Sequence, residues 1–261
     1  MNIIKSSSEI DAMREGGAIL SSVLGQVAAA VRPGSDTREL DSLAERLIRE
    51  AGGRPSFKGY RSDGESRGFP STVCTSINHE VVHAPAAPGR KVRSGDVLKL
   101  DIGMWYGGLC TDMAVTVPVG EINDDLRRLA VVTRESLRLG LEKAIVGNWI
   151  SDIGKAVDRH VRRNGFSTVK DLVGHGVGRD VHEDPRIPNY FDPSLRPVKL
   201  VRGMTLAIEP MVNAGSDEVR ILPDEWTIVT ADGRPSAHFE VTLAITEEGT
   251  EILTPLPEVG L

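Results

Sequence analysis

Residues 98–116 read LKLDIGMWYGGLCTDMAVT. From Val97 to Gly103 the side chains alternate and favour β-structure. Gly107-Gly108 has the composition of a two-residue hairpin turn, and residues 111–117 have the composition of a returning strand. The sequence therefore predicts an antiparallel hairpin of two mostly apolar strands, a little before the midpoint of the chain.

Two carboxylates interrupt these apolar strands. A turn at Gly107-Gly108 places Asp101 opposite residue 114, so Asp112 is its diagonal neighbour on the same face of the sheet. Such a pair repels and is poorly solvated, so it needs a cation or a raised pKa. A bound metal ion meets both requirements. The alternative is that each carboxylate lies in water at a strand end or caps a turn.

Three more residues belong to this pattern. Glu209 follows the apolar run 204–208, and Glu240 precedes the apolar run 241–245. His175 lies within GHGVG, where flanking glycines permit unusual backbone angles and a close approach to the imidazole. A single histidine in such a place is more commonly structural or part of a surface loop.

The ligand types indicate which metals are expected. Four carboxylates and one imidazole form an oxygen-rich set for divalent ions, whereas structural zinc sites favour cysteine. Cys74 and Cys110 have no paired spacing. Two ions about 3.5–4 Å apart, sharing bridging carboxylates, are suited to hydrolysis.

Helical periodicity marks four segments, which are residues 8–31, 36–51, 124–144 and 150–163. A shift of 113 positions brings Gly34 onto Gly147 and Gly52 onto Gly165. This match fits either a duplication that produced two similar halves or two unrelated amphipathic helices. No linker divides the chain, so we expect one α+β domain over residues 1–261.

Composition narrows the class of protein. Hydrophobic residues make up 40% of the 261 positions and charged residues 26%, as in globular enzymes. The net charge of −6 argues mildly against non-specific binding of nucleic acid and so against DNA as a partner, although a local basic patch would still allow such binding. The N-terminus has no apolar stretch of the signal-peptide type, and no window reaches the run of about 20 apolar residues that spans a membrane. We expect a cytoplasmic protein that binds no membrane.

In combination, five segments resemble the type I methionine aminopeptidases, and the resemblance covers nearly the whole chain. The segments are STVCTSINHEVVHAP (71–85), LKLDIGMWYGGLCTDMAVT (98–116), GHGVGRDVHEDP (174–185), MTLAIEPM (204–211) and DEWTIVTADGRPSAHFEVTLAITEEG (224–249). The resemblance implies the pita-bread fold, in which two pseudo-twofold related halves share an antiparallel sheet covered by helices. It also implies removal of the initiator methionine from nascent chains whose second residue is small.

Five metal ligands follow from the resemblance, and they would hold two divalent ions of cobalt, manganese, iron or zinc. The ligands are Asp101, Asp112, His175, Glu209 and Glu240. Asp112 and Glu240 would bridge the ions, and Glu209 would pass a proton from water to the leaving amine. His83 would contact the scissile amide, and His182 would hold the carbonyl oxygen as negative charge develops. The implied partners are nascent N-termini and, transiently, the ribosome, with the enzyme a monomer.

The resemblance also implies an apolar methionine pocket, formed by Phe69, Cys74 and Trp226, with Tyr60 nearby. Ordinary core packing is the alternative for each residue and the favoured interpretation of Tyr60. Residues 61–67, RSDGESR, replace a shorter connection in the family. Their polar, glycine-containing composition predicts a surface loop near the pocket, which puts the role of Tyr60 in doubt. Val181 stands where an aromatic residue often precedes the second histidine.

Two other functions compete with this one. X-Pro aminopeptidases and creatinase-like hydrolases also carry segments like GHGVG and VHE. They usually have a large extra N-terminal domain, which we do not expect here, and they lack CTSINHEVVHA together with DEWTIVTADGRPSAHFE. A catalytically inactive binding module of the same fold would be expected to lack metal ligands, whereas all five are present.

Overall fold

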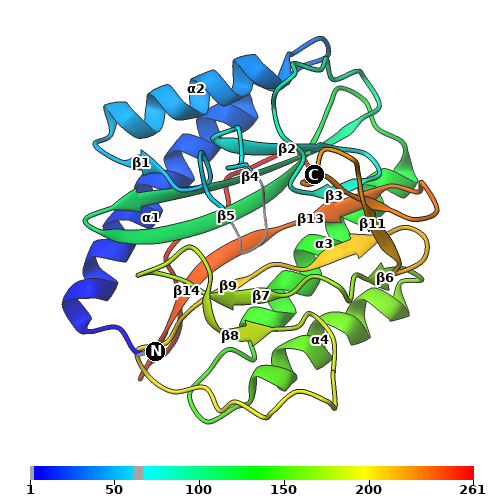
Figure 1. The fold of residues 1–261 in the computed structure, drawn as a ribbon. Coiled ribbons are helices and arrows are strands. Elements are labelled where there is room, and N and C mark those ends of the chain that lie inside the picture. The colour runs from blue at the N-terminus through cyan, green and yellow to red at the C-terminus, as the bar shows by residue number, and fades with distance from the viewer. Residues whose placement is uncertain (1–2, 62–66) are drawn as a thin grey trace.

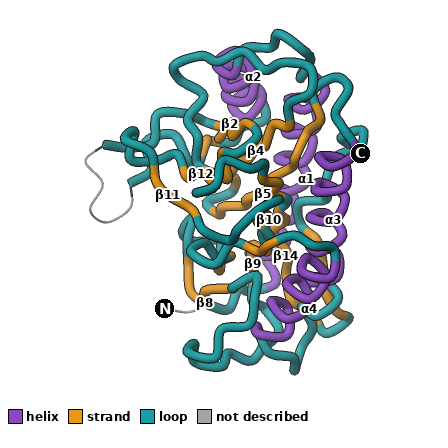
Figure 2. Tube along the Cα trace, turned by 90° about the vertical axis from the view of Figure 1, so that its right-hand side faces the viewer, coloured by secondary structure: helices purple, strands orange, loops and turns teal. Residues whose placement is uncertain are grey.

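The structure is a computed structural model that describes residues 3–61 and 67–261. Within these residues, four helices are layered against a nine-stranded sheet (Figure 1). Figure 2 shows α1, α3 and α4 along one side of the strands, with loops along the other. The predicted α+β class is confirmed. Residues 62–66, within the polar insertion, lie outside the described residues, so the prediction of a surface loop there stays a prediction.

The four helices lie where periodicity predicts them. They are α1 (Ser7–Ala29), α2 (Thr37–Glu50), α3 (Asp124–Leu141) and α4 (Ile150–Arg163). The α1 N-terminus carries a capping box, in which the Ser6 hydroxyl accepts from the Glu9 backbone and the Glu9 carboxylate accepts from the Ser6 backbone. The ends differ from the predicted ones by at most three residues, because terminal turns are not fixed by the apolar stripe alone.

The two halves repeat each other in structure. α2 and α4 coincide after the shift of 113, and so do the short strands β1 (Arg54–Pro55) and β6 (Ser167–Thr168). The paired glycines share left-handed backbone angles: φ is 91° at Gly34 and 92° at Gly147. Two unrelated amphipathic helices would not share their flanking turns and strands, so duplication is the better interpretation.

The predicted hairpin forms the middle of the large sheet. β4 (Val97–Tyr106) and β5 (Leu109–Pro118) are joined by Gly107-Gly108, both with positive φ. Asp101 pairs with Ala114 and Asp112 with Gly103, which is the predicted register. β14 (Glu240–Thr246) follows β5 in the sheet, and β9 (Thr205–Ile208) and β7 (Gly174–Gly176) come next. The five candidate ligands therefore arise on neighbouring strands or at their ends.

The remaining strands are short and were not predicted. They are β2 (Val73–Ile77), β3 (Glu80–Val82), β8 (Glu183–Ile187), β10 (Met211–Asn213), β11 (Val219–Ile221), β12 (Ile228–Thr230), β13 (Ser236–His238) and β15 (Gly249–Ile252). Segments of three to five residues are too short to show a period.

The main core lies between the helices and the sheet. It is aliphatic, as the low aromatic content predicts: Leu20 and Leu24 of α1, Ile48 of α2 and Leu100 of β4 are all fully buried. None of the helices in the described ranges is long and apolar enough to cross a membrane.

Candidate active site

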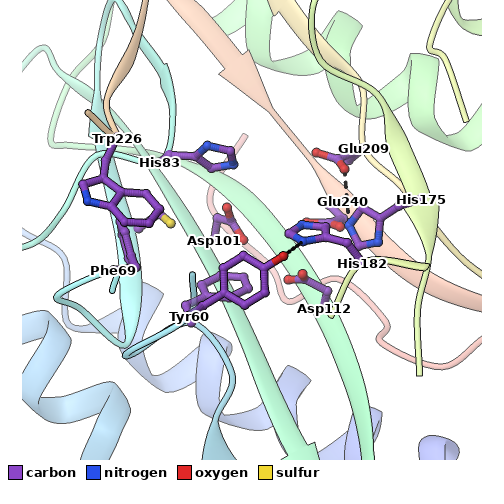
Figure 3. Close-up of a pocket in the computed structure, with 12 residues that line it drawn as sticks. Tyr60, Phe69, His83, Asp101, Asp112, His175, His182, Glu209, Trp226 and Glu240 are labelled. Carbon is purple, nitrogen blue, oxygen red and sulfur yellow. Dashed lines mark hydrogen bonds and ion pairs between the residues drawn. The ribbon is translucent and has the colours of Figure 1, made fainter. Parts of the chain in front are cut away.

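One central cavity of about 100 Å³ opens beside strands β4, β5 and β14. The residues that line it are Phe57, Tyr60, Phe69, Cys74, His83, Asp101, Asp112, His175, His182, Glu209, Trp226 and Glu240. Figure 3 shows Asp112, His175, His182, Glu209 and Glu240 grouped on one side of this cavity and Phe69 and Trp226 on the other, with Tyr60 between them and its hydroxyl against His182. Every site residue named from the sequence lies here.

The carboxylates of the cavity are buried without enough hydrogen-bond donors. Asp101, Asp112 and Glu240 are 6%, 3% and 2% exposed. Each has one buried oxygen with no hydrogen-bond partner among the described residues. Buried acceptors are normally satisfied, and a buried carboxylate needs a positive partner. The donor set therefore fits a divalent cation.

Burial also raises the pKa of these carboxyl groups. The pKa of Asp101 rises to about 7 and that of Glu209 to about 8, with desolvation the leading cause. The pKa values of Asp112 and Glu240 rise well above their usual range, because desolvation is reinforced by the neighbouring carboxylates. A divalent ion at this position would reverse the effect, since its charge favours the ionised form.

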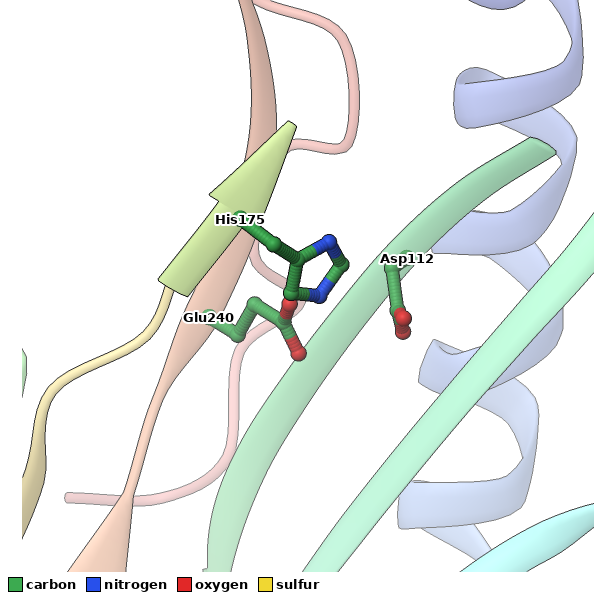
Figure 4. A group of neighbouring side chains, drawn as sticks. All are labelled: Asp112, His175 and Glu240. Atoms are coloured by element: carbon green, nitrogen blue, oxygen red, sulfur yellow. The ribbon is translucent and has the colours of Figure 1, made fainter. Parts of the chain in front are cut away.

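The ligand atoms are close enough to share an ion. One atom each from Asp112, His175 and Glu240 lies within 4.8 Å of the others (Figure 4). His175 Nδ1 lies 2.9 Å from the carbonyl oxygen of Gly176. Because a carbonyl only accepts, Nδ1 carries the proton and Nε2 keeps its lone pair. Burial lowers the pKa of His175 to about 3, which keeps the ring in the neutral form that binds metals.

His83 and His182 flank the carboxylates. His83 follows β3 with φ at 59°, a strained backbone for a residue other than glycine, and this conformation is typical of functional positions. Burial lowers the pKa of its imidazole to about 4. His182 comes from the loop between β7 and β8, and its ring meets that of His175 edge to face at 4.4 Å.

Tyr60 contradicts the sequence-based interpretation. It lines the cavity, and its hydroxyl lies 2.7 Å from Nδ1 of His182 (Figure 3). Ordinary core packing is therefore the wrong description. The prediction failed because the partner, His182, is far away in sequence and the intervening insertion obscured the alignment of Tyr60 with the family pattern.

The other side of the cavity is apolar. Phe69 and Trp226 meet edge to face at 5.2 Å. Cys74 on β2 lies opposite Asp101 in the sheet and is 3% exposed. Burial raises the pKa of its thiol, so Cys74 is a neutral wall residue.

Comparison with known proteins places this geometry in a family. The family described as metallopeptidase family M24 matches residues 11–247. The chain belongs to metallopeptidase family M24. It is 47% identical to the methionine aminopeptidase of Clostridium perfringens and 48% identical to methionine aminopeptidase 1 of Bacillus subtilis. Each alignment covers 97% of this chain and 99% of the relative.

Solved structures agree with this assignment. The crystal structure of methionine aminopeptidase from Thermotoga maritima matches with a TM-score of 0.91 and 40% identity, over 98% of this M24 chain and 99% of the other. Prolidase from Pyrococcus furiosus shares only the fold, with a TM-score of 0.74 and 21% identity over 98% of this chain and 66% of its own. The predicted pita-bread fold is confirmed.

Two residues of this M24 site were missed from the sequence. His238 is 1% exposed, and its Nε2 lies 3.5 Å from Glu209 Oε2. With Glu209 and Glu240 it forms a second group of ligand atoms within 4.8 Å of one another. The sequence signal for His238 is its position two residues before Glu240, because residues two apart in an extended chain lie on the same face. Phe57, in the loop after β1, carries no comparable signal.

Proposed function

We propose that this chain is a methionyl aminopeptidase, which removes the N-terminal initiator methionine from nascent proteins and peptides whose second residue is small. The observation that carries the proposal is a single cavity lined by four carboxylates and His175, which are residue types that can bind metal ions, and by the aromatic side chains of an apolar pocket. The high identity to proteins named methionine aminopeptidase supports the same activity.

We infer that two divalent ions are held by the cavity carboxylates and His175, with Asp112 and Glu240 shared between them. The unsatisfied buried oxygens of Asp101, Asp112 and Glu240 support this donor set. When bound, the ions would polarise the scissile carbonyl and make water a stronger nucleophile. Cobalt, manganese, iron and zinc all suit carboxylate and imidazole ligands, and their supply decides which is used.

The side chains have separate tasks in this proposal. Glu209, whose carboxylate lines the cavity, takes a proton from the attacking water and passes it to the leaving amine. His182 donates an N–H to the carbonyl oxygen as negative charge develops there. His83, poised by its strained backbone, contacts the scissile amide.

The apolar wall selects the first side chain. An unbranched thioether fits between Phe57, Phe69, Cys74 and Trp226, and its burial contributes about 0.8 kcal/mol per CH₂ group. An adjoining open cavity of about 490 Å³ shares His83, His182 and Glu209 and extends past Met211. We assign the rest of the peptide to this second cavity, with the second residue nearest the ions, where only a small side chain fits.

The test compares kcat/KM for peptides of equal length that begin Met-Ala, Met-Lys, Leu-Ala and Leu-Pro. We expect Met-Ala to be cleaved best by a wide margin, and manganese or cobalt to restore activity after chelation. Cleavage of Leu-Pro as fast as Met-Ala would instead identify an X-Pro enzyme. No cleavage of any peptide by metal-loaded protein would favour the inactive binding module.

We further propose that the chain acts in the cytoplasm as a monomeric, single catalytic domain over residues 1–261 that meets nascent chains briefly at the ribosome. The sheet, which runs continuously through both halves, supports one domain. The substrate itself supports the ribosome contact, since new N-termini emerge there. Sedimentation of the purified protein alone tests the monomeric state, and sedimentation with ribosomes tests the ribosome contact.

A further inference from the structure

We propose that Tyr60 is a positioning residue for His182: its hydroxyl donates to Nδ1 and so holds the imidazole with the proton on Nε2, ready to donate to the substrate. The inference rests on the proposed function, because it assigns His182 the task of stabilising the carbonyl oxygen.

The main chain fixes Tyr60 on both sides. Its N–H donates to the carbonyl of Phe57 at 2.8 Å, and its carbonyl accepts from the N–H of Phe69 at 2.8 Å. Gly59 donates in turn to Phe69. These hydrogen bonds close the base of the segment that carries the insertion. The Tyr60 ring therefore starts from a fixed backbone beside the cavity.

His182, in contrast, is an exposed side chain at the cavity mouth. Its backbone is restrained because the Glu183 carboxylate accepts from the Asp180 N–H at 3.0 Å. That restraint does not set the rotation of the imidazole, and surface side chains exchange between rotamers readily. The ring is instead flanked by His175 at 4.4 Å and by Tyr60 at 5.2 Å, both edge to face.

The Tyr60 hydroxyl distinguishes the two ring nitrogens. A phenolic hydroxyl carries one proton and is able to donate it in a hydrogen bond. When it donates to Nδ1 at 2.7 Å, the proton of the neutral imidazole must be on Nε2. The reverse arrangement would leave a lone pair on Nε2, which repels a carbonyl oxygen that is gaining negative charge. Only the first arrangement matches the task of His182.

The same contact joins the two halves of the molecule. Tyr60 lies between β1 and β2 in the first half, and His182 lies between β7 and β8 in the second (Figure 3). The orientation of a second-half catalytic group is thus set by a first-half side chain.

The test is Tyr60→Phe, which keeps the ring in the pocket and removes only the hydroxyl. We expect kcat for a Met-Ala peptide to fall roughly tenfold, the value of one hydrogen bond, with KM nearly unchanged. Tyr106→Phe is the matched control, because it removes a hydroxyl that binds Glu15 away from the cavity. It should leave kcat at the wild-type value.

A double-mutant cycle separates positioning from general loss of structure. In a His182→Ala background, Tyr60→Phe should change kcat no further, because the group that it positions is gone. If the two effects multiply instead, Tyr60 acts independently of His182 and the inference is wrong. Wild-type kcat in Tyr60→Phe would also overturn it.

A second readout does not depend on turnover. Nitrogen NMR of the zinc-loaded protein, with the His182 signals assigned by comparison with His182→Ala, reports which ring nitrogen is protonated. We expect the proton on Nε2, and an Nδ1 signal that moves toward the value of a free acceptor in Tyr60→Phe. A proton on Nδ1, or an unmoved Nδ1 signal, contradicts the inference. Lack of Met-Ala cleavage by wild-type protein would refute the proposed function, whereas this spectrum tests Tyr60 separately.

Discussion

The buried acids of the cavity make the stability of the metal-free protein depend on pH. With their pKa values raised, to about 7 at Asp101 and about 8 at Glu209 and well above the usual range at Asp112 and Glu240, these groups hold more protons in the folded than in the unfolded state. Stability then falls as pH rises from about 4, the unfolded value, through these folded pKa values. His83 and His175, whose pKa values burial lowers, make stability rise with pH, but only below the unfolded value of about 6.5.

We therefore expect chelated protein to lose stability between pH 6.5 and 8. Lys99, whose pKa burial lowers to about 7, opposes this slope, but it is one group against four carboxylates. Urea unfolding at several pH values within this window checks the sign. Saturating zinc should remove the slope, since the carboxylates then stay ionised. Stability that rises with pH in chelated protein would contradict the pKa shifts.

We expect substitution of His182 and substitution of Glu240 to have different effects on the protein. His182→Ala should lower kcat about 10²–10³-fold, the cost of one lost donor to a developing oxyanion, and leave metal content intact. Glu240→Ala should lose bound metal, since in the proposed site two ions share that carboxylate. Elemental analysis after gel filtration gives the metal content. Equal metal loss in both variants would show that His182 is itself a ligand.

The sequence could predict those residues whose neighbours carry a pattern. Asp101, Asp112 and Glu240 lie in apolar strands, where a charge is conspicuous. Tyr60 and Phe57 lie in an irregular segment without a period, and their function depends on contacts with residues distant in sequence. Such contacts depend on packing, which no local pattern contains.

Lys5 forms a buried ion pair with Glu183, the residue that follows His182. Its ammonium lies 2.6 Å from the Glu183 carboxylate, and both side chains are nearly inaccessible to solvent. Lys5→Met leaves the Glu183 charge buried without its partner, which costs about 3–5 kcal/mol. We expect a lower urea midpoint and a lower kcat. Arg202→Met, which breaks an exposed pair with Glu247, is the control and should cost about 0–1 kcal/mol. Equal losses of stability in the two variants would show that the buried Lys5–Glu183 pair stabilises the protein no more than the exposed pair does.

Long elements were predictable and short ones were not. α2 has an apolar stripe of Leu40, Ala44 and Ile48 that repeats at a spacing of four residues, as expected for one face of a helix. β10 and β13 have three residues each and exist because neighbouring strands supply their hydrogen bonds. The loop after β8 likewise takes its course from tertiary contacts.

Metal should stabilise the molecule as a whole, because the proposed ligands come from both halves. Asp101 and Asp112 belong to the first hairpin, whereas His175, Glu209 and Glu240 belong to the second half. An ion that binds only the folded state adds about 2.7 kcal/mol at a concentration 100 times its Kd. Thermal unfolding with and without manganese measures the shift. Asp112→Asn should remove most of it, and a full shift in that variant would refute shared ligation.

The matching turns at Gly34 and Gly147 bear on how such a cavity could arise. Before the two copies were fused, a single ancestral unit would have had to associate with itself about a twofold axis to form the whole sheet. Identical subunits place identical side chains on either side of such an axis. Fusion released that constraint. One copy could then specialise in holding the ions and the leaving group, while the other contributed two acids and the walls that recognise the substrate.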